Sequence, residues 1–129
     1  DFCLSRGLGD VYKRQLQELA RKIYEKGGIV AAVCHGVVGL LNIKLSNNCL
    51  LLKDRKVTGF SNIEEKLVEL NDVVPFLTEI ELVGRGGNYS KHDEPWKPYV
   101  VDDDRLITGQ NPASTAMLAE AVLKKLKGS

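Results

Sequence analysis

The chain has few aromatic residues and no excess of charge of either sign. Aromatic side chains make up 6% of its 129 residues, too few for a surface that stacks nucleic-acid bases. Its 18 basic residues are balanced by 17 acidic ones, which excludes a strongly basic nucleic-acid-binding protein and an acidic disordered tail. No hydrophobic run approaches the length that crosses a bilayer. The composition therefore indicates a soluble α/β domain with neither a nucleic-acid nor a membrane partner.

Cysteine is also scarce, and its spacing is uninformative for metal binding. Cys3, Cys34 and Cys49 form an odd set with no C-x-x-C pair, which argues against a disulfide scaffold and a zinc ribbon. A reducing compartment, the cytoplasm, fits this usage best. His92 and the two acidic residues after it form one polar cluster without a second cluster, so a solvated loop is favoured over a metal site. We expect no metal and no cofactor.

The first fifteen residues differ in origin from the rest. Residues 5–15, SRGLGDVYKRQ, match one reading frame of the transposase-end adapter used in sequencing libraries. We interpret residues 1–15 as an artefactual, adapter-like arm, with a genuine flexible N-terminal arm as the alternative. Residues 16–129 are then the C-terminal part of one domain.

The pattern after this arm is typical of a doubly wound α/β sheet. Residues 16–26 have the apolar spacing of an amphipathic helix, which the Gly27-Gly28 pair ends. Residues 29–33 form a short apolar run that suits a parallel strand buried on both faces. A tight turn and a second helical segment, residues 37–41, follow.

The remaining elements are shorter. Asn62 or Ser61 is placed to cap a helix, and Asn111 to cap the last one. We expect strands at residues 49–52 and 56–57, a helix at 63–70, a helix at 76–83 after Pro75, a strand beginning near residue 88, a hairpin from 99–101 and 105–108, and a final helix at 112–126.

Cys34 lies in a small-x-nucleophile-x-small pattern. A sharp strand-to-helix turn brings the residues two before and two after the nucleophile together, and Ala32 and Gly36 are small enough for it. At the start of a helix, the dipole and free N–H groups favour a thiolate and can hold an oxyanion. The alternative is a buried structural cysteine.

Four segments in this order resemble the DJ-1/PfpI superfamily, and within it the Hsp31-like, glutathione-independent glyoxalase branch. They are AAVCHG at residues 31–36, VTGFSNIEE at 57–65, EPW at 94–96 with Tyr99, and RLITGQNPAS at 105–114. The resemblance covers residues 16–126. It implies an α/β, flavodoxin-like three-layer sandwich of the class I glutamine amidotransferase type, truncated at its N-terminus.

The resemblance also implies a site. Cys34 matches the nucleophile, His35 the neighbouring histidine, and Glu65 the acid that orients this histidine, with Glu64 as the competitor for that role. Val37 replaces a proline common in relatives, which should alter the pocket wall rather than the chemistry. A further acid and a glycine-containing oxyanion loop of the family would precede residue 16 and are not in the chain.

The implied activity is that of a glyoxalase III-type lyase (D-lactate dehydratase), which converts methylglyoxal into lactate without glutathione. The partner is then a small reactive dicarbonyl substrate, and the full-length parent is expected to be a homodimer, while this fragment is expected to be inactive. The alternatives are a stress-response holdase chaperone and an amidase or peptidase of the same fold. Trp96 and Tyr99 either line the pocket or pack in the core, and Asn111 and Ser114 either cap a helix or line the pocket.

Overall fold

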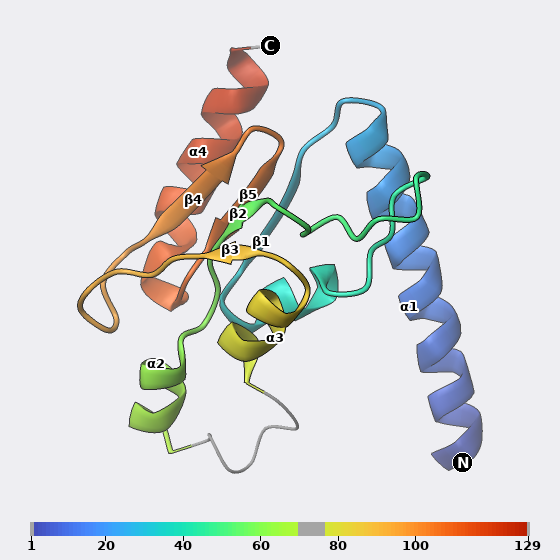
Figure 1. Cartoon of the computed structure of the whole chain (residues 1–129), viewed down its shortest axis with the longest axis horizontal. Helices are drawn as coiled ribbons and strands as arrows, with labels where there is room; N and C mark the ends of the chain where they lie inside the picture. Colours follow the sequence, from blue (N-terminus) through green and yellow to red (C-terminus); the bar gives the residue numbers. More distant parts are fainter. Residues whose placement is uncertain (1, 70–76, 129) are drawn as a thin grey trace.

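The computed structural model describes residues 2–69 and 77–128, with side chains from residue 14 onward (Figure 1). Helices and strands alternate along most of the chain. In order they are α1 (Phe2–Glu25), β1 (Val30–Val33), the 3-10 helix η1 (Cys34–Leu40), β2 (Lys56–Val57), α2 (Asn62–Leu67), α3 (Thr78–Gly84), β3 (Asn88–Tyr89), β4 (Val100–Asp103), β5 (Leu106–Gly109), the 3-10 helix η2 (Pro112–Ser114) and α4 (Thr115–Lys127). None of the helices described here is long and apolar enough to span a membrane.

The main sheet is mixed and has the order β1-β5-β4. β1 and β5 run parallel, with Val30 opposite Leu106 and Val33 opposite Gly109. β4 pairs antiparallel with β5, which confirms the predicted hairpin. Within the described ranges, the outer edge of β1 has no partner strand. A second, two-stranded sheet pairs β2 with β3 in parallel.

Helices cover this sheet unevenly. α4 packs against β5, β1 and β4, whereas α1 contacts β1. The first half of α1 extends past the other elements, toward the end marked N (Figure 1). Ala31 in the middle of β1 is exposed, so the expectation that both faces of this strand are buried is wrong for the described residues.

The core joins the sheet to α1 and η1. Leu106, Val57 and Leu82 are fully buried at its centre. Tyr24, near the end of α1, is buried against the core and lies 5.6 Å from the guanidinium of Arg55 and 4.2 Å from that of Arg105. Stacking of cations on the tyrosine ring adds to hydrophobic burial in fixing this end of α1.

Several element boundaries differ from the sequence expectations. The first helix begins at Phe2 rather than residue 16, so the adapter-like arm is continuous with it. Residues 49–52 form no strand: Lys53 N–H bonds to Leu50 C=O and Arg55 N–H to Leu52 C=O, which closes successive turns. The last helix is preceded by η2 instead of starting at residue 112. Residue 70, Pro75 and the first residue of the helix expected at 76–83 lie outside the described residues.

Candidate active site

Cys34 lies where β1 ends and η1 begins. Its φ is +59°, in the left-handed region that non-glycine residues rarely adopt. Such a conformation costs roughly 1 to 2 kcal/mol, so the surrounding structure must impose it. Val33 before it is extended, which makes the turn from strand to helix sharp. The strained elbow expected from the sequence is therefore present.

The sequence predicts a small residue at Gly36 because the elbow would press it against Ala32, and the structure does not show this close approach. A Cβ atom added at Gly36 would meet no atom within 4 Å among the described residues. The close approach is instead at Gly109 of β5, where a Cβ would lie 2.9 Å from Val33 Cγ2 and 3.2 Å from Ser114 Cβ. Gly109 lets the neighbouring strand and the segment before α4 pack tightly beside the elbow.

His35 lies between the thiol and a buried carboxylate. Its Nδ1 is 3.8 Å from Cys34 Sγ, and its Nε2 is 2.8 Å from Glu65 Oε2. Glu65 is 1% exposed, and its other oxygen has no hydrogen-bond partner among the described residues. A carboxylate accepts the Nε2–H, which leaves Nδ1 as the acceptor that faces the thiol. The Phe60 ring, 4.3 Å from the imidazole between centroids, packs against it.

The Glu64 carboxylate has no hydrogen bond to this pair in the described residues and lies in a cluster of hydrogen-bond donors. Its Oε1 accepts bonds from the Ser61 N–H, the Ser61 hydroxyl and Gln110 Nε2, at 3.2, 2.9 and 2.8 Å. Its Oε2 accepts the Trp96 N–H at 2.9 Å and Asn111 Nδ2 at 2.7 Å. Burial raises the pKa of Glu64, but these hydrogen bonds outweigh it and lower the pKa below its ordinary value. Of the two glutamates, Glu65 is therefore the one beside His35.

The environment of Cys34 opposes the thiolate. Partial burial raises the pKa of this thiol, and the charges of Glu64 and Glu65 raise it further, while a backbone hydrogen bond from His35 acts in the opposite direction. The N–H at the start of the helix therefore favours the thiolate, as expected, but burial together with the two carboxylates outweighs it and the net shift of the Cys34 pKa is upward. η1 is a 3-10 helix of only 7 residues, and two carboxylates lie close by.

Sequence reasoning missed Phe60 and Gln110, because nothing in their spacing marks them as neighbours of His35 or of Glu64. Of the two roles that the sequence left open for Asn111 and Ser114, the structure shows helix capping, and both side chains are fully buried. Asn111 precedes η2 and accepts the Ser114 hydroxyl at 2.9 Å, and it also donates to Glu64. Tyr99 donates its N–H to Ser114 Oγ.

The other candidates lie apart from the thiol. Nδ1 of His92 accepts the Glu94 N–H within a surface loop. No group of His, Cys, Asp and Glu side chains in the described part of the chain is arranged to hold a metal ion. Cys49 is a half-buried free cysteine.

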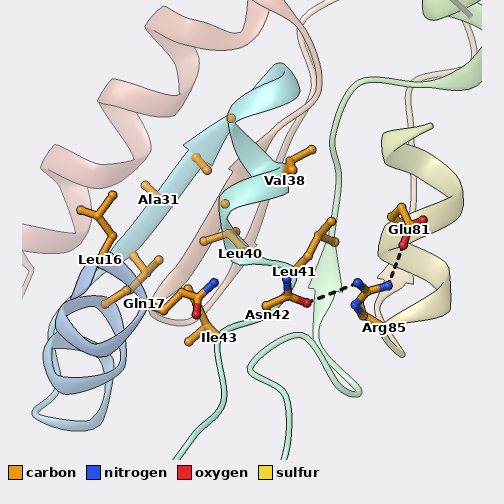
Figure 2. A pocket seen from close by; sticks show the side chains of 15 residues that line it. Leu16, Gln17, Ala31, Val38, Leu40, Leu41, Asn42, Ile43, Glu81 and Arg85 are labelled. Atoms are coloured by element: carbon orange, nitrogen blue, oxygen red, sulfur yellow. Dashed lines mark hydrogen bonds and ion pairs between the residues drawn. The ribbon is translucent and has the colours of Figure 1, made fainter. Parts of the chain in front are cut away.

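An apolar cavity of about 480 Å³ lies between α1, β1 and η1 (Figure 2). Leu16, Ala31 and Leu40 line it, and Arg85 lies at its margin, bonded to Asn42 and Glu81. Gly36 borders the cavity, but Cys34, His35 and Glu65 do not. The reactive groups therefore do not open into this cavity.

Comparison with known proteins gives matches over most of the chain. The model of the DJ-1/PfpI family matches residues 9–125. The glutathione-independent glyoxalase HSP31 of Saccharomyces cerevisiae is 34% identical over 137 residues, covering 98% of this chain and 57% of that protein.

Two solved structures have the same fold over the matched region. Glyoxalase III from Candida albicans superposes with a TM-score of 0.82 at 34% identity, covering 87% of this chain and 49% of that one. The 24 kDa Rapid Encystment Protein of Francisella tularensis gives a TM-score of 0.82 at 45% identity, covering 85% and 48%. The chain thus spans about half the length of the relatives that it matches.

Proposed function

Because this chain belongs to the DJ-1/PfpI family, we propose that it supplies the reactive cysteine of a glutathione-independent glyoxalase, which converts methylglyoxal into lactate. Residues 16–129 then form the C-terminal part of one such domain. The observation that carries the proposal is the linked arrangement of Cys34, His35 and Glu65, with contacts of 3.8 and 2.8 Å. The names of the relatives, glyoxalase III and glutathione-independent glyoxalase, support the substrate class.

The proposed reaction begins at the Cys34 thiol. His35 Nδ1 accepts the thiol proton, and the sulfur attacks the aldehyde carbon of methylglyoxal, so that a C–S bond forms and the carbonyl π electrons move to oxygen. In the proposed mechanism, N–H groups at the start of η1 stabilise this oxyanion, which takes up a proton to give a hemithioacetal. Glu65 keeps the imidazole oriented and stabilises its positive charge.

The second half of the reaction moves hydrogen between neighbouring carbons. A base removes the proton from the hemithioacetal carbon to give an enediolate, and the adjacent carbon is protonated. The proton of the hemithioacetal hydroxyl passes to the former ketone oxygen, which gives a lactoyl thioester of Cys34. Water then adds to the thioester carbonyl, the C–S bond breaks, and lactate leaves as the thiol re-forms. The net change is the addition of one water to methylglyoxal, with no external oxidant or reductant.

The test uses residues 16–129 joined behind the upstream half of the Saccharomyces cerevisiae relative. We expect this chimera to consume methylglyoxal without glutathione and to release lactate, measured by loss of dicarbonyl absorbance and by a lactate assay. Cys34→Ser should abolish turnover, and Cys49→Ser should retain it. A folded chimera that is inactive, or one in which Cys34→Ser remains active, would contradict the proposal.

The same variant separates the enzyme from the chaperone and the amidase. A holdase acts through exposed apolar surface, so suppression of client aggregation would persist in Cys34→Ser. An amidase would hydrolyse small amides through the same cysteine but would not produce lactate from methylglyoxal. Measuring the three activities on the chimera and its Cys34→Ser variant therefore assigns the role of the thiol.

A further inference from the structure

Three buried side chains hold the loop between β3 and β4, residues 90–99. The His92 N–H donates to Gln110 Oε1 at 2.8 Å, and the Trp96 N–H donates to Glu64 Oε2 at 2.9 Å. Asn111 Nδ2 donates to the Lys97 carbonyl at 2.9 Å. The loop is thus bonded along its main chain to residues that follow β5 and to one residue of α2.

These contacts converge on Glu64. Gln110 and Asn111, which hold the loop, also donate to the two oxygens of the Glu64 carboxylate. Glu64 is 0% exposed, and its carboxylate accepts five hydrogen bonds from protein groups. A buried carboxylate with this many donors stays ionised and fixes their positions, because each of its bonds is charge-assisted.

Two aromatic contacts connect Trp96, which Glu64 binds, to His35, the proposed base. Trp96 has a φ of +65°, an unfavourable backbone conformation for a large side chain. Its ring lies 5.7 Å from that of Phe60, and Phe60 lies 4.3 Å from the His35 imidazole, between centroids. Trp96, Phe60 and His35 therefore form a row of packed rings that ends at the group facing the thiol.

We propose that Glu64 is a positioning residue: through the main chain of Trp96 it holds the row Trp96–Phe60–His35 and so sets the orientation of the imidazole beside Cys34. That this orientation serves catalysis rests on the proposed function. The structural coupling between Glu64 and the His35 ring does not depend on it. The coupling is tested on the free chain without substrate. It can therefore be disproved while the glyoxalase proposal stands, and the glyoxalase proposal can be disproved while the coupling stands.

The sequence provides two specific probes, because it contains a single tryptophan and two histidines. In Glu64→Gln, which keeps the side-chain size but removes the charge and one acceptor oxygen, we expect Trp96 fluorescence to shift to the red and acrylamide to quench it more strongly. The His35 ring protons, assigned with a His92→Gln variant, should lose the NMR shift that the Phe60 ring current causes. Glu94→Gln, which changes an exposed carboxylate of the same loop, is the control and should alter neither signal.

Trp96→Ala tests the link without touching the buried carboxylate. It should change the His35 ring-proton shifts in the same direction as Glu64→Gln, while far-UV circular dichroism stays that of the parent. Unchanged His35 shifts in a folded Trp96→Ala chain overturn the proposal. This test remains decisive if the Glu64→Gln variant does not fold. A red-shifted Trp96 with unchanged His35 shifts in folded Glu64→Gln overturns it as well.

Discussion

At the residue scale, the site depends on two consecutive residues, Cys34 and His35, in the turn after β1. Cys34 and His35 are adjacent, yet their reactive atoms face one another because Cys34 has a left-handed backbone and His35 is held by Glu65. The 3.8 Å between sulfur and nitrogen is a loose contact that binding can shorten.

The first prediction concerns the thiol pKa. Burial and two nearby carboxylates raise the pKa of Cys34, so its thiolate forms only at a higher pH than that of a free cysteine. The rate of iodoacetamide alkylation at Cys34, followed by mass spectrometry from pH 6 to 11, should rise with a midpoint above that of N-acetylcysteine. A midpoint at or below the reference would contradict the assigned environment.

Glu65 is the subject of the second prediction. In the chimera, Glu65→Gln should lower kcat by about a hundredfold or more, because the imidazole loses the partner that orients it and stabilises its charge. Glu69→Gln, an exposed glutamate just beyond α2, should leave kcat unchanged. Equal rates for Glu65→Gln and the parent would remove Glu65 from the proposed mechanism.

At the element scale, α2 begins with a capping box that links the fold to the site. The Ser61 hydroxyl accepts the Glu64 N–H at 3.1 Å, and the Glu64 carboxylate accepts the Ser61 N–H. The same carboxylate then holds Trp96 and Asn111. The glutamate of this helix cap therefore also fixes the loop of residues 90–99, which is distant in the sequence.

Ser61→Ala should lower the free energy of unfolding by roughly 1 to 2 kcal/mol, as expected for loss of an N-cap. Asn62→Ala is the matched control, because the Asn62 side-chain oxygen is buried without a hydrogen-bond partner in the described residues. Urea unfolding measures both variants. If Asn62→Ala proves the more destabilising of the two, Ser61 is not the effective cap.

The sequence predicted the elements whose signals are local. The helix before Gly27, the strand before Cys34 and the hairpin around residue 104 follow from apolar spacing and turn residues, and the structure has all three. The segment at 49–52 has the composition of a strand, but it forms only an isolated antiparallel bridge between Leu50 and Lys44, followed by turns from which Leu51 and Leu52 are buried. Composition does not distinguish these cases, because both bury the same side chains.

The site was predictable to a similar degree. The motif order identified Cys34, His35 and Glu65, and the structure brings these residues together. The raised pKa of Cys34 was not predictable, because it depends on burial and on how close two carboxylates lie after folding. The five donors around Glu64 come from residues 61, 96, 110 and 111, and only the tertiary structure brings them together.

At the scale of the whole molecule, residues 1–15 remain predicted to be dispensable. The first half of α1 runs toward the end marked N (Figure 1). Its buried anchor, Tyr24, lies at the other end of the helix, one residue before Glu25. Deleting residues 1–15 should leave the melting temperature nearly unchanged. Tyr24→Ala should lower the free energy of unfolding by about 3 kcal/mol, as expected for a buried aromatic residue. A large loss on deletion would show that the arm is part of the fold.

Self-association of the chain alone is the last prediction. Among the residues that the structure describes, no strand pairs with the outer edge of β1, and Ala31 is exposed beside an apolar cavity, which together favour pairing between copies. Size-exclusion chromatography should show oligomers in exchange with monomer, whose share falls as the protein is diluted. Ala31→Lys should increase the monomer fraction, and Ala119→Lys on the exposed side of α4 should not. A monodisperse monomer of the parent chain would argue against an open edge.

The parallel pairing of β1 with β5 joins segments near opposite ends of the chain. During synthesis, Cys34 therefore leaves the ribosome long before β5, the strand that packs beside its elbow through Gly109. Non-local parallel pairs form slowly, because the entropy of closing a long loop is lost before the contact contributes any stability. The thiol consequently passes through a period in which it is exposed and unrestrained, and the speed of sheet closure decides how long it stays open to oxidants.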